Sequence, residues 1–228
     1  MSRSFSWLSF LSLGLFAGCQ GLIEAAVVVY LRALGSAGTS ELAQLHDLLR
    51  ALDSRLLMVE RQRELASLAL LLVPAYLFSE RFAYRLLAYI FCFGIWDLAY
   101  YAFLHGFIGW PQHWSVLDVL FLVPRPWIAP VLCPLSIAAG MAVFATSYLV
   151  LARTRALKSP HPLAWVALFA GMALVLYAFV GQTDAYLRAT EQLPRFAWGW
   201  FGAGYALLAA AAAWMLIQLY RQPKARFF

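Results

Sequence analysis

The chain has 228 residues, of which 64% are hydrophobic and 12% are charged. Soluble domains carry about 25% charged residues, so this composition excludes an ordinary soluble enzyme, a disordered chain, a disulfide-rich scaffold and a coiled coil. The formal net charge of +6 comes from Lys and Arg beside apolar runs, without a basic stripe of interleaved aromatics. We therefore expect a multi-pass integral membrane protein whose partner is the lipid bilayer and not a nucleic acid.

Six apolar runs can each form a transmembrane helix, because a span needs roughly 20 mostly apolar residues. We expect an all-α fold, a polytopic bundle of about six transmembrane helices forming a single integral membrane domain over residues 1–228. The expected spans are residues 5–31, 56–78, 86–104, 127–152, 163–181 and 197–220. An even number of spans would place both termini on the same side of the membrane.

Two connecting segments are predicted to be more than loops. Residues 40–59 carry leucine or valine at spacings of three and four with charges between, which predicts an amphipathic helix on the outer surface. Residues 116–123 are predicted to be a short re-entrant or interfacial helix, because eight helical residues cover only about 12 Å. Ser115 and Asp118 would cap its start. Pro130 and Pro134 predict a distorted beginning for the next span.

The charges in the connections predict the orientation. The segments 81–85 and 153–158 are short and basic, and Glu80 is the one acid beside them. Cytoplasmic connections carry an excess of Lys and Arg, so we expect both termini in the cytoplasm. Residues 16–19 resemble a lipoprotein signal that ends at Cys19, which is the alternative for the N-terminus. The apolar chain at 22–31 favours a first span that is retained.

Ionisable side chains at membrane depth mark a candidate functional site, since each is costly to bury. Glu24 lies within the first span, with Gln20 one turn away. Asp97 lies near the middle of the third span, and the spacing of four places Asp97, Tyr101 and His105 on one stripe of that helix. Under the expected orientation these groups all belong to the outer half of the membrane. A structural ion pair, for example Glu24 or Asp97 with Arg63, is the alternative interpretation.

The simplest arrangement is an acidic pocket open to the extracytoplasmic side, which could hold a bound cation. Its candidate binding residues are Glu24, Glu64, Asp97, Tyr100, Tyr101, His105, Arg63 and Gln20, and its candidate lid residues are Trp110, His113, Trp114 and Asp118. Asp118 as a helix cap and the tryptophans as interfacial aromatics are the simpler alternatives.

The sequence contains no phosphate loop, nucleophile elbow or metalloprotease motif that would identify a reaction. Three functions are compatible with the pattern of buried acids. The first is binding or transport of a cation, a proton or a small polar solute. The second is a membrane enzyme acting on a lipid-type substrate, with Glu64 or Asp97 as general base. Its distinguishing sign would be an apolar groove that opens sideways beside the acids. The third is a non-catalytic accessory subunit of a membrane complex, or a homo-oligomer, in which the charges pair across helices.

Several segments also have a distinctive order of amino acids. They are residues 23–32, 63–66, 93–101 (Phe-Gly-Ile-Trp-Asp-Leu-Ala-Tyr-Tyr), 109–111 and 118–127, followed by 130–132 and Pro134. Together they resemble a family of bacterial polytopic inner-membrane proteins of uncharacterised activity, over roughly residues 22–134. The resemblance implies a retained first span and a location in the bacterial inner membrane. It also implies a lysine where His105 stands, which favours a cation beside Asp97 over a metal-ligating histidine.

Overall fold

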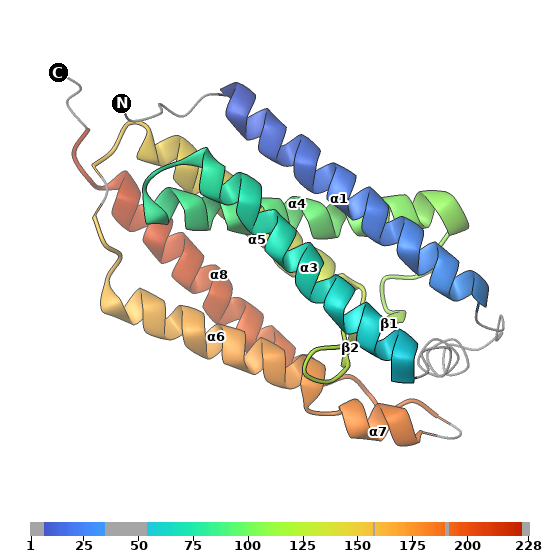
Figure 1. Cartoon of the computed structure of the whole chain (residues 1–228). Coiled ribbons are helices and arrows are strands. Elements are labelled where there is room, and N and C mark those ends of the chain that lie inside the picture. The colour runs from blue at the N-terminus through green and yellow to red at the C-terminus, as the bar shows by residue number, and fades with distance from the viewer. Residues whose placement is uncertain (1–6, 35–53, 157, 190–191, 225–228) are drawn as a thin grey trace.

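The computed structural model describes residues 7–34, 54–156, 158–189 and 192–224, and its main architecture is a bundle of long helices (Figure 1). The helices are α1 (Trp7–Leu34), α3 (Ser54–Phe78), α4 (Phe82–Ile108), α5 (Leu132–Ala152), α6 (Pro162–Val180), α7 (Thr183–Arg188) and α8 (Trp198–Tyr220). Between α4 and α5 the chain forms a small antiparallel hairpin of β1 (Leu117–Phe121) and β2 (Trp127–Pro130). The predicted all-α helical bundle is confirmed.

Five segments are long and apolar enough to cross a membrane: α1, α4, α5, the segment Pro162–Arg188 and α8. Large apolar side chains lie exposed along them, including Leu8 at 74% and Phe169 at 59% exposure, as expected for surfaces that face lipid. The chain is therefore a membrane protein. Six apolar spans were expected, but α3 is not apolar enough along its length to count as a span, because its first half carries five charged residues.

The helix α3 nevertheless runs lengthwise along the bundle and packs against α4 and α1 (Figure 1). It continues from residue 54 into the predicted second span without a break. Residues 54–59 of the expected amphipathic helix are thus the first turns of α3, whereas residues 40–53 lie outside the described residues.

The start of α1 and the end of α8 lie at the same end of the bundle, here called the terminal end (Figure 1). The guanidinium of Arg153, just after α5, lies 5.4 Å from the ring centroid of Trp7 at the start of α1. A backbone bridge pairs Arg155 with Lys224, beyond the end of α8. This terminal end holds the basic connections, and the β-hairpin lies at the opposite end (Figure 1).

The short helix predicted at residues 116–123 is wrong, because this segment is strand β1. Its register pairs Leu117 with Pro130, Asp118 with Ala129 and Val119 with Ile128. The apolar, β-branched run followed by prolines suits an extended strand and a turn better than a helix. Consequently there is no capping box at Asp118.

The predicted start of the fourth span at residue 127 is corrected by the same hairpin. Residues 127–130 form β2, and α5 begins only at Leu132. Pro134 then falls within the first turn of α5, where its missing N–H would have had no helical acceptor. The distortion expected at the beginning of the fourth span is thus the change from strand β2 to helix α5.

Close backbone approaches at glycines hold neighbouring helices together. A Cβ atom on Gly171 of α6 would lie 2.8 Å from the carbonyl oxygen of Gly204 on α8. A Cβ on Gly21 of α1 would lie 2.6 Å from the carbonyl oxygen of Trp96 on α4. Small residues at such crossings let membrane helices pack by direct backbone contact.

Candidate functional site

A cavity of about 450 Å³ lies among the helices at the hairpin end of the bundle. Its polar lining residues come from α1, α3, α4 and β1, and are Glu24, Glu60, Arg63, Glu64, Asp97, Tyr100, Tyr101 and Asp118. The structure thus brings six of the eight candidate binding residues to one cavity. The other two, Gln20 and His105, do not line it.

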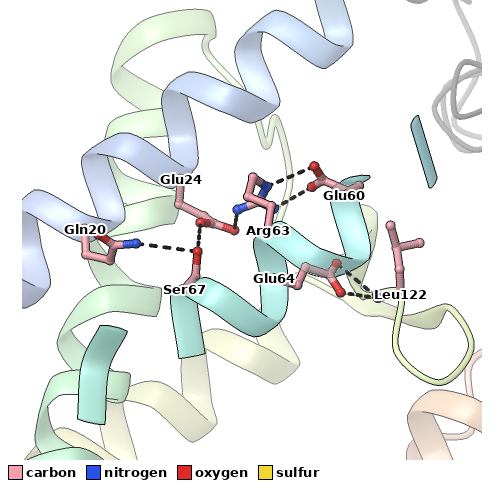
Figure 2. A network of polar contacts seen from close by, with 7 residues as sticks. All are labelled: Gln20, Glu24, Glu60, Arg63, Glu64, Ser67 and Leu122. Carbon is pink, nitrogen blue, oxygen red and sulfur yellow. Dashed lines mark hydrogen bonds and ion pairs between the residues drawn. The ribbon is translucent and has the colours of Figure 1, made fainter. Parts of the chain in front are cut away.

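Arg63 is the centre of a buried ion-pair network on the cavity wall (Figure 2). Its Nη1 pairs with the carboxylate of Glu24, and its Nε donates to Oε2 of Glu60 at 2.9 Å. The hydroxyl of Ser67 donates to Glu24 at 3.2 Å, and Nε2 of Gln20 donates to that hydroxyl at 3.5 Å. The pairing of Glu24 with Arg63 that the sequence allowed is therefore present, and Gln20 supports it from behind.

Glu64 and Arg61 attach the end of β1 to α3. Both carboxylate oxygens of Glu64 accept from the backbone N–H of Leu122, at 2.9 and 3.1 Å (Figure 2). Nε of Arg61 donates to the carbonyl oxygen of the same residue at 3.1 Å. Because Leu122 is 3% exposed and buried backbone groups need partners, these two side chains replace a strand partner. Glu64 is thus engaged in holding the hairpin.

Asp118 is buried on the same cavity wall. It accepts from the hydroxyl of Tyr101 at 3.0 Å, and Nη2 of Arg32 lies 3.6 Å from its other oxygen. The guanidinium of Arg32 in turn lies 3.9 Å from the ring centroid of Trp110. Burial raises the pKa of the Asp118 carboxyl above its ordinary value, while Arg32 and the Tyr101 hydroxyl lower it.

Asp97 differs from the other cavity carboxylates. It lines the cavity from α4, beside Tyr100 and Tyr101. Within the described part of the chain, its carboxylate has no hydrogen-bond or ion-pair partner. Glu24, Glu64 and Asp118 each have one. Asp97 is therefore the acid that a ligand in the cavity would find uncompensated.

The remaining candidates divide between the core and the surface. Trp110 is 3% exposed and packs against Arg32 and Tyr101, but it does not line the cavity. His113 and Trp114 are exposed, the latter at 65%, and do not line the cavity. His105 is also exposed, although it lies on the stripe of Asp97 and Tyr101. Among the residues that the structure describes, no three His, Cys, Asp or Glu side chains are grouped to hold a metal ion.

Sequence reasoning missed the apolar half of the cavity. This wall belongs to α5, α6 and α8, and includes Ile137, Met141, Met172, Val175, Leu176, Phe179 and Leu208. No sequence signal distinguishes these side chains from ordinary lipid-facing ones, since both kinds are apolar residues within spans. Sequence reasoning also missed Arg61, because residues two apart on a helix point to different faces and Arg63 gave no indication of its contact with Leu122.

Comparison of the chain with protein-family models, with curated proteins and with solved structures gave no match. The resemblance to a bacterial membrane-protein family therefore stays a prediction, and the site is interpreted from its own geometry.

Proposed function

We propose that this membrane protein binds a positively charged organic solute in the cavity, as a receptor or as the binding step of a transporter. The observation that supports the proposal is the state of Asp97, which faces the cavity without a partner in the described part of the chain. A carboxylate held in a largely apolar chamber is stabilised by an opposite charge.

The charges around the cavity favour a cation. Five carboxylates line it, from Glu24, Glu60, Glu64, Asp97 and Asp118, whereas Arg63 is the one basic side chain among the described lining residues. Arg63 is already paired with Glu24 and Glu60. An anionic solute would meet net repulsion, and a cation would meet attraction strengthened by the low dielectric of the site. The absence of a three-ligand cluster among the described residues favours an organic cation over a metal ion.

The orientation of the proposed binding protein follows from the two ends of the bundle. The terminal end carries basic connections, including Arg81, Arg85, Arg153 and Arg155. These residues favour a cytoplasmic location for that end. The cavity, at the hairpin end, would then belong to the extracytoplasmic half of the bacterial inner membrane.

The test compares two aspartates in lipid nanodiscs. Calorimetric titration with methylammonium and with guanidinium should show binding to the wild-type protein, weakened at least about tenfold by Asp97→Asn, since one charged hydrogen bond is worth about 1.5–3 kcal/mol. The control is Asp184→Asn, because the side chain of Asp184 is 65% exposed and pairs with Arg125 away from the cavity. Absence of binding to the wild type, or equal binding to Asp97→Asn, would refute the proposal.

A membrane enzyme acting on a lipid-type substrate is the second candidate, favoured by the apolar wall of the cavity. In that function Asp97 would be the general base, since Glu64 is occupied by Leu122. Mass spectrometry of vesicle lipids incubated with the protein should then show a product that Asp97→Asn abolishes. Unchanged lipids would refute the enzyme function and leave ligand binding as the function of the cavity.

A further inference from the structure

The cavity has two chemically different halves within one volume. The half formed by α1, α3, α4 and β1, here called the acidic half, carries all the charged side chains among the described lining residues, interspersed with apolar ones, whereas the half formed by α5, α6 and α8 is apolar. The volume of about 450 Å³ lies within the range of small-molecule sites, about 300–1,000 Å³. A small hydrated cation would use the acidic half and leave the apolar half without a partner.

Two side chains of the apolar half are partly exposed on α6. Met172 and Leu176 line the cavity from the middle of α6, and they are also 42% and 40% exposed. Because α6 belongs to one of the five candidate spans, the surface beside these side chains faces the hydrocarbon part of the membrane. A ligand with an apolar chain can thus enter from the bilayer without first dissolving in water.

The acidic half determines which head group such a ligand carries. Among the described lining residues, the acid without a hydrogen-bond or ion-pair partner is Asp97, and the guanidinium of Arg63 is already shared by two carboxylates. A phosphate or carboxylate head would therefore find no free cation on the described cavity wall, and a hydroxyl head would leave the charge of Asp97 unbalanced. An ammonium head supplies both the charge and the hydrogen-bond donors.

We infer that the ligand is a membrane-dissolved amphiphile with an ammonium head and a single apolar chain. Its head binds at Asp97, and its chain lies along Met141 and Met172 between α5 and α6. The charge of the head rests on the proposed function, whereas the chain and the entry from the bilayer go beyond it.

The test uses a dodecylammonium probe with a diazirine in its chain, in vesicles of phosphatidylcholine that contain the full-length protein. After illumination, mass spectrometry compares labelling at Met141, which lines the cavity, with labelling at lipid-facing Phe169. Wild type and Asp184→Asn should label Met141 equally, and Asp97→Asn should reduce that labelling about tenfold relative to Phe169. A dodecanol probe with the same diazirine should show no dependence on Asp97.

A second measurement separates this inference from the function on which it rests. The calorimetric titration with methylammonium reports the cation site alone, because this probe has no apolar chain, whereas labelling of Met141 by the long-chain probe reports the apolar half as well. If methylammonium binding depends on Asp97 but labelling of Met141 does not, the amphiphile is refuted and the cation site stands. If neither depends on Asp97, both proposals fail. Equal Asp97 dependence for the ammonium and alcohol probes would overturn the charge of the head group.

Discussion

Arg63 is the ion-pair partner of two buried carboxylates, so replacing it should destabilise the fold strongly. The side chains of Glu24 and Glu60 are only 11% and 10% exposed. Removing one member of a buried ion pair costs about 3–5 kcal/mol, because it leaves an uncompensated charge. We expect Arg63→Ala to lower the free energy of unfolding by that amount. Equilibrium unfolding in mixed micelles with increasing dodecyl sulfate, followed by circular dichroism, measures it.

The matched control is Arg125→Ala, which breaks the pair with Asp184. Those two side chains are 42% and 65% exposed, and surface pairs contribute about 0–1 kcal/mol. A combined Glu24→Gln, Glu60→Gln, Arg63→Met variant should recover at least half of the lost stability, since no charge is then left unpaired. If Arg63→Ala lies within about 1 kcal/mol of Arg125→Ala, the buried network is not what stabilises this end of the bundle.

Three further predictions concern the hairpin and the helix contacts. Glu64→Ala should leave the buried N–H of Leu122 unpaired, at about 1–3 kcal/mol, and accelerate its hydrogen exchange; an unchanged exchange rate would exclude the attachment. Gly171→Ala forces a Cβ against the backbone of α8 and should cost about 1–3 kcal/mol in a thermal unfolding assay. The control is Gly202→Ala, whose Cβ meets nothing within 4 Å, and equal costs would contradict the close packing. Burial raises the pKa of Asp118 in the fold, so its contribution to stability should fall as pH rises above the unfolded value of about 4. Asp118→Asn should flatten that fall, and an identical pH slope would count against this reasoning.

The acidic part of the site could be predicted because charge within an apolar span is a strong signal. Glu24 and Asp97 stand out in such spans, and the spacing of four residues places Tyr101 on the same helix face as Asp97. The same spacing failed at His105, because helical periodicity assigns a face but does not say where that face leaves the bundle. At His105 the stripe of α4 is already exposed.

The hairpin could not be predicted because short apolar runs do not distinguish a strand from a helix. Its identity depends on pairing between β1 and β2 and on the attachment of Leu122 to side chains about 60 positions earlier. Asp118 was accordingly assigned to a helix cap, whereas it is buried against Tyr101 and Arg32. The apolar wall of the cavity could not be predicted from the sequence for a different reason. Side chains that line a cavity and side chains that face lipid are of the same apolar type.

The most direct measurement of the central claim is the charge selectivity of a thiol placed at position 97. In a variant with Asp97→Cys and with Cys19, Cys92 and Cys133 replaced by alanine, two membrane-impermeant methanethiosulfonate reagents, one cationic and one anionic, are added from either side of the membrane. Four carboxylates still line the cavity, so the cationic reagent should react about tenfold faster, and only from the extracytoplasmic side. Equal rates for the two reagents, faster reaction of the anionic one, or reaction from the cytoplasmic side would contradict an acidic cavity that faces outward.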